Sequence, residues 1–234
     1  MDFKKDQRLM VDNLILSRMI EHANPSKGDT ILEIGAGNGH LTVELAEKAG
    51  KVFAVEKDRK LASLLKERIR QFSNVQVIEG DALKLELPAC NKIVSNLPYS
   101  ISKKITVKLI EHGFNEAFLL YQKEFAEKLL AKPGEENYRF ITALAQSTCT
   151  VEKLMEIPPT AFKPEPKVSS ALVKLKQKTK PEKGYVTLLQ ELFNHKNKNL
   201  KNILKDVDKK HSEKKPAEMT PEELREFCLE FIRR

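Results

Sequence analysis

The sequence predicts an α/β fold with a mainly parallel sheet covered by helices on both faces, followed by a small helical domain. Up to about residue 147, apolar strand-like runs alternate with amphipathic helical stretches, a pattern typical of strand–helix–strand units. Two further strands are predicted near residues 149–157 and 170–175. The segment between them is too short for a helical crossover, so these two strands should form an antiparallel pair at one edge of the sheet.

The first of the alternating strands, residues 30–34, runs into the glycine-rich turn Gly35-Ala36-Gly37-Asn38-Gly39, and a helix is predicted over residues 41–48. Glycines let a backbone approach a ligand closely and adopt positive φ. His40 stands where the dinucleotide fingerprint G-x-G-x-x-G has its third glycine. Glu33 adds a carboxylate beside the ligand, which would repel a pyrophosphate and attract a cationic sulfonium or amino-acid head group. The turn therefore favours S-adenosylmethionine over NAD as the ligand.

Acidic side chains follow the next two strands as well. Residues 51–56 form an apolar strand that ends on Glu56, which is placed to bind two ribose hydroxyls. Residues 75–79 form another, and Asp81 just beyond it can accept a hydrogen bond from the adenine amino group of a cofactor. An open α/β sheet binds its ligands at the carboxyl ends of its strands. One cofactor site is therefore predicted from the residues at the ends of four successive strands: Glu33, Glu56, Asp81 and Asn96.

The fourth strand ends in Asn96-Leu97-Pro98-Tyr99, which offers the groups needed to hold a planar base by its exocyclic amino group. Pro98 stops the strand and fixes φ, so the residues beside it are held in a rigid turn. An adenine amino nitrogen is a poor nucleophile because its lone pair is delocalised into the ring. Acceptors on both N–H bonds, here the Asn96 side-chain oxygen and a carbonyl near Pro98, would favour a pyramidal nitrogen as a bond forms. The ring of Tyr99 would stack on the base, a role for which its hydroxyl is not needed.

With these motifs, the sequence from about residue 4 to residue 204 resembles the small-subunit ribosomal RNA adenine N6-dimethyltransferases of the kasugamycin-resistance type. Three further segments carry the resemblance. Residues 121–126 are similar to the family's strand-to-helix segment after the target site, and residues 193–200 to the start of its basic C-terminal region. Residues 158–170 are similar to its proline-rich loop, which is a long and unusual motif.

The resemblance implies a Rossmann-like, seven-stranded S-adenosylmethionine-dependent methyltransferase sheet whose last strand is reversed. It implies dimethylation of N6 of adjacent adenosines near the 3′ end of small-subunit ribosomal RNA during ribosome biogenesis. It also implies that Phe162 packs against the target adenine on the face opposite Tyr99. Without the resemblance, Phe162 would be interpreted as a loop residue that covers the core.

Candidate site residues follow from the motifs and the resemblance together. Those expected to act on the target base are Asn96, Tyr99 and Phe162. Arg8 and Met10 are candidate cofactor contacts by position alone, because residues 6–10 depart from the family's N-terminal Gly-Gln motif. The residues expected to bind S-adenosylmethionine are Arg8, Met10, Glu33, Gly35, Gly37, Glu56, Asp81, Ala82 and Asn96.

The net charge of +8 and the isoelectric point of about 9.2 indicate a polyanionic partner, which the resemblance identifies as small-subunit ribosomal RNA or the pre-ribosomal small subunit. Polar composition marks residues 177–184 as a linker between a catalytic domain, residues 1–176, and a basic helical RNA-docking domain, residues 185–234. A helix is predicted over residues 186–206, whose lysines either contact RNA phosphates or form a solvated helix surface. The candidate phosphate contacts are Lys196, Lys198, Lys201 and Lys205.

The rest of the small domain is predicted to hold a loop and a second helix. Residues 209–216, which are rich in lysine, should form a mobile, solvated loop. The second helix should begin at Pro221, because Thr220 is a good N-cap residue and two acids follow in the first turn.

Cysteine usage and hydropathy limit the class of protein. Cys90, Cys149 and Cys228 are far apart and lack histidines at ligand spacing, which indicates reduced thiols and neither a disulfide framework nor a metal site. Cys90 lies off the predicted strand ends, so no covalent enzyme intermediate is expected. There is no long apolar run or signal peptide, so a cytoplasmic protein is expected, and a monomer.

Two alternative functions stay open. The antibiotic-resistance branch of the same superfamily modifies an adenine in large-subunit RNA and shares the glycine-rich and target-site motifs, but residues 122–124 and 162–170 favour the small-subunit branch. The second alternative is a non-catalytic ribosome-assembly or nucleic-acid-binding factor, and the intact cofactor motifs argue against it. A nicotinamide enzyme is disfavoured by Glu33 and by the missing third glycine.

Overall fold

The structure is a computed structural model that describes residues 9–233, so the candidate cofactor residue Arg8 lies outside the described residues. Its helices are α1 (Asn13–Ala23), α2 (His40–Lys48), α3 (Arg59–Arg68), α4 (Ser102–His112), α5 (Lys123–Leu130), α6 (Phe140–Thr148), α7 (Tyr185–Asn194) and α8 (Pro221–Ile232), with short 3-10 helices η1 (Tyr99–Ile101), η2 (Pro159–Ala161) and η3 (Leu200–Asn202). Its strands are β1 (Leu9–Met10), β2 (Thr30–Ile34), β3 (Lys51–Glu56), β4 (Val75–Glu79), β5 (Lys92–Asn96), β6 (Glu116–Gln122), β7 (Cys149–Ile157), β8 (Phe162–Lys163) and β9 (Ser170–Gln177).

The chain divides into two compact units. The sheet unit consists of the residues up to Ala126 together with Glu152–Lys176, and the helical unit consists of Glu127–Val151 together with the residues from Gln177 onward. The segment 127–151 thus groups with the C-terminal helices, although most of it precedes the last two strands of the sheet. The reason is helix α6, which is buried at eight of its nine positions and packs against α7 and α8.

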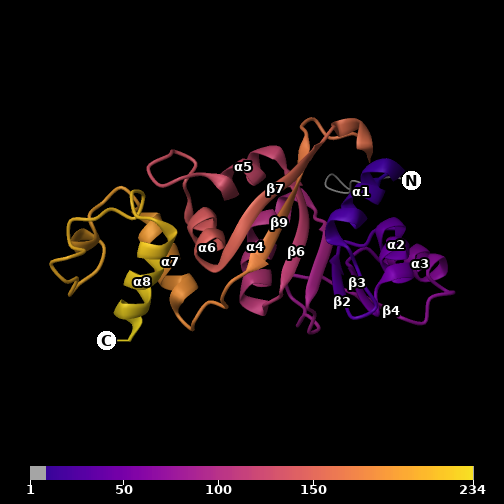
Figure 1. Ribbon diagram of the computed structural model, residues 1–234, viewed down its shortest axis with the longest axis horizontal. Coiled ribbons are helices and arrows are strands. Elements are labelled where there is room, and N and C mark those ends of the chain that lie inside the picture. The colour runs from indigo at the N-terminus through magenta and orange to yellow at the C-terminus, as the bar shows by residue number, and fades with distance from the viewer. Residues whose placement is uncertain (1–8, 234) are drawn as a thin grey trace. The chain divides into compact units, whose positions relative to one another are not determined.

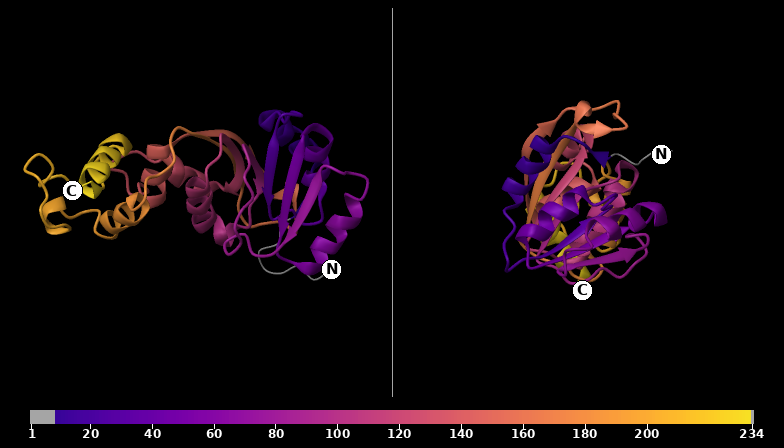
Figure 2. Two further views of the ribbon diagram at one scale, coloured as in Figure 1. Left: turned by 90° about the horizontal axis from the view of Figure 1, so that it is seen from below. Right: turned by 90° about the vertical axis from the view of Figure 1, so that its right-hand side faces the viewer.

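The main sheet has seven strands in the order β4-β3-β2-β5-β6-β9-β7 (Figure 1), which confirms the predicted fold class. Strands β2 to β6 pair in parallel, whereas β9 runs antiparallel to β6. From β2 the chain moves outward through α2 and α3 in one direction, and from β5 through α4 in the other. Because such crossovers are right-handed, α2 and α3 lie on one face of the sheet and α4 on the opposite face, as Figures 1 and 2 show.

The strand register places the carboxyl ends of the central strands together. Ile34 pairs with Val55, whose carbonyl accepts hydrogen bonds from the backbone N–H groups of Gly35 and Ala36 at 2.8 and 3.1 Å. On the other side of β2, the buried hydroxyl of Ser95 accepts a hydrogen bond from the N–H of Ile34 at 2.8 Å. The glycine-rich turn and the end of β5 are thus fixed side by side.

A second, two-stranded sheet joins the N-terminal segment to the proline-rich loop. In it β1 pairs antiparallel with β8, so that Met10 lies opposite Phe162. Both side chains are buried in a hydrophobic cluster that also contains Leu16 of α1 and Leu41 of α2. This cluster closes one side of the strand ends at which ligands are expected.

Helix α7 ends at Asn194, so the prediction of one helix over residues 186–206 is wrong. After α7 the chain turns at His195 and continues to the short helix η3. Asparagine side chains compete for backbone hydrogen bonds, and the asparagines at 194, 197 and 199 supply the local reason for the early end. The four candidate lysines therefore do not share a helix face.

The loop predicted at residues 209–216 is only partly solvated, because it buries His211, which is 3% exposed. The Asp208 carboxylate accepts hydrogen bonds from the backbone N–H and the ring Nδ1 of His211, at 3.0 and 2.9 Å, and the ring lies 5.2 Å from that of Phe227 on α8. Helix α8 begins at Pro221 as predicted, with a capping box formed by Thr220 and Glu223. Within residues 9–233, no helix is both long and apolar enough to cross a membrane.

Candidate active site

Two adjoining cavities of the sheet unit lie at the carboxyl ends of the central strands. The first has a volume of about 40 Å³, and its walls come from β1, β2, the glycine-rich turn, α1, α2 and the end of β5. It brings together five of the candidate cofactor residues: Met10, Glu33, Gly35, Gly37 and Asn96. Its apolar wall of Leu9, Leu16 and Leu41 was not predicted, because a single apolar residue carries no signal of its own.

Glu33 places a carboxyl group in the wall of the first cavity, away from water. The residue is 2% exposed, and its Oε2 accepts a hydrogen bond from the Thr42 hydroxyl at 2.6 Å. Burial raises the pKa of Glu33 to about 8, although the Thr42 hydroxyl opposes the shift; the nearby charge of Glu56 adds to it. A cationic group in the cavity would favour the carboxylate form, so the site fits an ammonium or sulfonium ligand.

The second cavity, of about 170 Å³, has Gly35 in common with the first and extends toward β3 and β4. It contains the other candidate cofactor residues that the structure describes: Glu56, Asp81 and Ala82. Its apolar walls come from Ile34, Val55, Pro98 and Ile101. A cavity lined by both apolar and acidic side chains is suited to a nucleoside, whose base packs on the apolar walls while its polar groups meet the acids.

Two carboxyl groups line the second cavity, and their pKa values are shifted in opposite directions. Glu56 is buried, and its oxygens accept hydrogen bonds from the backbone N–H groups of Gly37 and Asp58, at 2.8 and 2.7 Å; burial outweighs these bonds and raises its pKa. The Asp81 carboxylate accepts from Lys57 Nζ at 2.8 Å and from the Leu83 N–H at 3.0 Å, and these bonds lower its pKa. Each oxygen keeps lone-pair capacity for a ligand donor.

Gly35 connects the cavities to the target-site turn. Its φ is +73°, and a Cβ built on it would lie 3.2 Å from Pro98 Cδ and 3.7 Å from the Asn96 carbonyl oxygen. Only glycine tolerates both this φ and this approach. The glycine-rich turn and the Asn96–Tyr99 turn are therefore packed directly on one another.

Tyr99 is half-buried and begins η1, directly after Pro98. Its hydroxyl lies 2.6 Å from the Ser170 Oγ, at the start of β9, and either oxygen can donate in this hydrogen bond. The Tyr99 hydroxyl therefore has a structural partner that was not predicted. A contact between residues this far apart in sequence gives no local pattern from which it could be predicted.

Phe162 is buried in this structure and is 3% exposed. Its ring belongs to the hydrophobic cluster with Met10 and Leu16, which is the role of a loop residue that covers the core. Stacking of Phe162 on a target base stays a prediction, and it requires the ring to become uncovered when the base enters.

Other residues that line the second cavity were not predicted, although they lie beside predicted site residues. Lys57, Ser100 and Ile101 line the second cavity, one directly after Glu56 and two directly after Tyr99. Their position next to strand-end residues is the signal that could have found them. Burial raises the pKa of the Cys90 thiol to about 12, so it is protonated at neutral pH and unsuited to nucleophilic attack.

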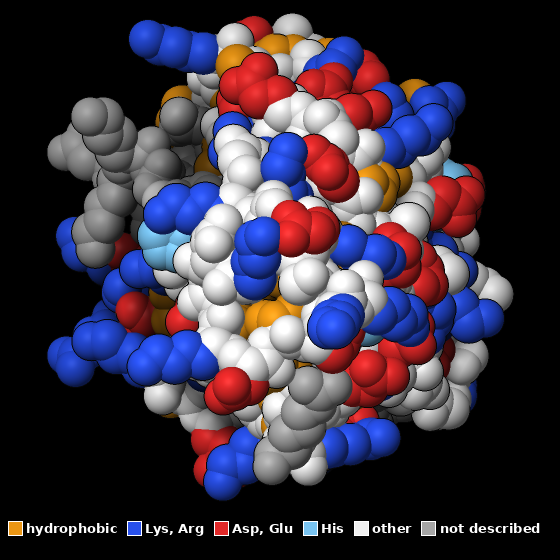
Figure 3. All heavy atoms as spheres, turned by 90° about the vertical axis from the view of Figure 1, so that its left-hand side faces the viewer, with side chains coloured by type: hydrophobic (Ala, Val, Ile, Leu, Met, Phe, Trp, Pro, Cys, Tyr) orange, Lys and Arg blue, Asp and Glu red, His pale blue; other side chains and the backbone are white. Residues whose placement is uncertain are grey.

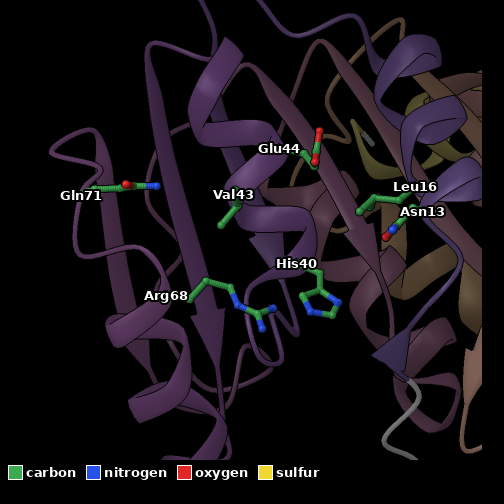
Figure 4. Close-up of a pocket in the computed structure, with 7 residues that line it drawn as sticks. All are labelled: Asn13, Leu16, His40, Val43, Glu44, Arg68 and Gln71. Carbon is green, nitrogen blue, oxygen red and sulfur yellow. The ribbon is translucent and has the colours of Figure 1, made fainter.

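A third cavity, of about 330 Å³, lies among α1, α2 and α3. Leu16 and His40 line both this cavity and the first one. Figure 4 shows the ring of His40 and the guanidinium of Arg68 directed toward one another across it, with Glu44 at its side. None of its charged groups was predicted, because they stand on helix surfaces where a charged residue is ordinary.

The four candidate RNA-contacting lysines divide into two groups. The Lys196 Nζ donates to the carbonyl oxygens of Glu136 and Tyr138 at 3.1 and 2.9 Å, and Lys201 forms an ion pair with Glu213. Lys198 and Lys205 are exposed, and neither forms an ion pair with another residue of the range 9–233. Figure 3 shows that Lys and Arg side chains on the face of the helical unit are interspersed with Asp and Glu side chains.

Comparison with known proteins identifies the family. A family model described as "Ribosomal RNA adenine dimethylase" matches residues 2–226. The chain belongs to the ribosomal RNA adenine dimethylase family. Members of this family are S-adenosylmethionine-dependent methyltransferases, and the chain is an enzyme of this kind.

Similar proteins agree with this assignment. A "probable ribosomal RNA small subunit methyltransferase A" of Thermococcus sibiricus is 43% identical over 86% of this chain and 74% of its own length. The protein of the same description from Pyrococcus furiosus is 37% identical over 98% of this chain and 91% of its own length. A dimethyladenosine transferase from Plasmodium falciparum superposes with a TM-score of 0.84 at 30% identity, over 96% of this chain and 98% of its own. The 23S rRNA methyltransferase ErmE gives a TM-score of 0.72 at 25% identity, over 97% of this chain and 100% of its own.

Proposed function

We propose that this dimethylase adds two methyl groups to N6 of adjacent adenosines near the 3′ end of small-subunit ribosomal RNA. The observation that carries the proposal is the convergence of Glu33, Glu56, Asp81 and Asn96 on two cavities joined at Gly35. The small-subunit relatives at 37–43% identity support the choice of small-subunit over large-subunit RNA.

The residues fit S-adenosylmethionine as the bound methyl donor. The buried Glu33 carboxyl would hold the cationic amino-acid end, and the second cavity would hold the adenosine, with the ribose hydroxyls on Glu56 and the adenine amino group on Asp81. When bound, the cofactor supplies an electrophilic methyl group. Asn96 lines the same cavity as Glu33, which supports a role for its side chain at the donor end of the site.

In the methyl-transfer step, the chain's own groups hold and orient the target base. The Asn96 side-chain oxygen and a carbonyl of the adjoining turn accept hydrogen bonds from the two amino hydrogens, and the ring of Tyr99 stacks on the base. These acceptors favour the pyramidal nitrogen of the transition state, because its N–H bonds become stronger donors as charge develops. After the methyl group has been transferred, the amino group can lose its proton to water, so no strong base is required among the side chains.

The proposal is tested by mass spectrometry of ribosomal RNA after incubation with the enzyme and labelled S-adenosylmethionine. Unmethylated small and large subunits are the paired substrates. We expect dimethyladenosine at two adjacent positions near the 3′ end of the small-subunit RNA. Label confined to large-subunit RNA would instead support the antibiotic-resistance branch.

We expect Glu56→Ala to weaken S-adenosylmethionine binding by about 1.5–3 kcal/mol, the usual scale for hydrogen bonds to a charged group. Titration calorimetry measures this directly. The matched control is Glu79→Ala, because Glu79 pairs with Glu56 in register but is exposed and ion-paired with Lys66. Equal losses in both variants, or tight NAD binding without S-adenosylmethionine binding, would contradict the assignment of Glu56.

We expect Lys198→Gln and Lys205→Gln together to weaken RNA binding. The slope of the logarithm of the binding constant against the logarithm of the salt concentration should become less steep by about 0.7–0.9 for each phosphate that is no longer neutralised. Both side chains are exposed, so their replacement should leave the fold intact. Binding measured at several salt concentrations gives the slope. Lys196→Gln is a contrasting variant that should lower thermal stability, because two carbonyls lose their donor. A slope unchanged in the double variant would make these lysines an ordinary solvated surface.

A further inference from the structure

One hydrogen bond joins the target-site turn to the end of the proline-rich loop. The hydroxyls of Tyr99 and Ser170 lie 2.6 Å apart although the residues are 71 positions apart in the sequence. Tyr99 is the first residue of η1, and Ser170 is the first residue of β9. Both belong to the sheet unit, so the bond lies within one compact body.

Ser170 is a rigid anchor for this bond. The residue is fully buried, and its Cα pairs with that of Gln122 on β6. The ladder continues past it, because the N–H of Lys123 donates to the carbonyl oxygen of Ser169 at 3.0 Å. A serine has a single side-chain torsion ahead of its oxygen, so the sheet largely fixes the position of Oγ.

Tyr99, by contrast, does not lie on a strand of the sheet. It stands on a three-residue 3-10 helix whose N-cap, Pro98, makes no side-chain capping bond, and its side chain is only half-buried. Two torsions set the direction and the plane of its ring. A bond at the phenolic oxygen holds the ring at the end farthest from the backbone, where it restrains the first torsion and so the direction of the ring.

We propose that Ser170 is a positioning residue for methyl transfer, which it influences through the ring of Tyr99. The inference rests on the proposed function, in which that ring stacks on the target base. By fixing the direction of the ring, Ser170 fixes the place at which the base stacks and keeps the amino nitrogen in line with the Asn96 acceptor. Small errors of alignment cost rate steeply, so the effect belongs to the transfer step and leaves the methyl donor's affinity unchanged.

The test removes each hydroxyl while the ring is kept. Ser170→Ala and Tyr99→Phe are compared with wild type in single-turnover methylation of small-subunit RNA at saturating S-adenosylmethionine. We expect each variant to be slower by about fivefold to tenfold, the scale of one neutral hydrogen bond. The double variant should be no slower than the slower single variant, because both changes remove the same interaction. Cofactor affinity should match that of wild type.

The matched control is Ser147→Ala in the helical unit. Ser147 is buried and accepts a hydrogen bond from the Tyr185 hydroxyl at 2.7 Å, so the same kind of bond is removed between residues that line none of the three cavities described above. We expect a wild-type rate for this variant at a temperature where thermal unfolding shows every protein to be folded. Equal slowing by Ser147→Ala and Ser170→Ala would overturn the positioning role.

Tyr99→Ala separates this inference from the proposed function. If Tyr99→Ala is slow while Ser170→Ala and Tyr99→Phe turn over at the wild-type rate, the positioning role is wrong and the base site stands. If Tyr99→Ala also reacts at the wild-type rate, the proposed site itself is wrong. Should Ser170→Ala fail to fold, Tyr99→Phe alone decides the matter by the same criterion.

Discussion

Replacing Asn96 with alanine is expected to slow methyl transfer by about 100- to 1,000-fold, the scale of losing one preorganised hydrogen-bonding group that acts on the transition state. Asn96 is the last residue of β5, and it lines the cavity that contains Glu33. Its amide oxygen should accept more strongly as the amino nitrogen becomes pyramidal, so the loss should fall on kcat and spare RNA affinity. Single-turnover kinetics with product analysis measures the change.

RNA binding to the Asn96→Ala variant is the control for this result. Unchanged affinity together with a large loss of rate would show that the residue acts in the transfer step. A variant that methylates at the wild-type rate would place the target site elsewhere and contradict the proposed mechanism.

Glu33→Gln is expected to stabilise the ligand-free protein at alkaline pH while it weakens S-adenosylmethionine binding. The pKa of Glu33 is raised from 4.5 to about 8, so the folded state favours the neutral acid. This contribution to stability is fully present below about pH 4.5 and is lost as the pH rises through about 8. Between pH 6 and pH 9, wild type should lose on the order of 3 kcal/mol of unfolding free energy through this group.

Glutamine cannot ionise, so the Glu33→Gln variant should keep that stability at pH 9, and its amide oxygen can still accept from Thr42. Its affinity for S-adenosylmethionine should fall about 10- to 100-fold, because the carboxylate that faces the cation is gone. Wild-type affinity should also rise with pH up to about 8, since binding requires the proton to leave, whereas the variant should not show this rise. Denaturant unfolding and calorimetry at both pH values measure these effects.

Glu79→Gln is the control for that experiment, because Glu79 also ends a strand but is exposed outside both cavities. It should change neither stability at pH 9 nor cofactor affinity. Equal stability of wild type and Glu33→Gln across the whole range would mean that the carboxyl is not buried as described.

The parts of the site that could be predicted from sequence are those set by local rules. A glycine-rich turn after a strand demands positive φ, and parallel strands end at one edge, so Glu33 and Glu56 had to lie near Gly35. Other local rules predicted that the last two strands lie together at the sheet edge, and that α8 begins at Pro221, where Thr220 supplies a strong cap. Each of these features depends on a few neighbouring residues.

The parts that could not be predicted depend on residues distant in sequence. Lys196 looks like a free surface cation until the segment 127–151 folds against the C-terminal helices and presents two carbonyls to it. The burial of Phe162 follows from its pairing with Met10, and the hydroxyl of Tyr99 meets Ser170 only after β9 joins the sheet. No local pattern marks such contacts, because the residues that form them are ordinary in their own segments.

The central claim is that the two cavities joined at Gly35 hold one S-adenosylmethionine molecule with its reactive end toward Asn96. A crystal structure with a non-reactive analogue of that cofactor tests it most directly. We expect the amino-acid end beside Glu33, the ribose on Glu56, the adenine near Asp81, and the position of the methyl group facing the Asn96 side chain. An analogue bound in the third cavity, between His40 and Arg68, or with its adenosine beside Glu33, would contradict the account.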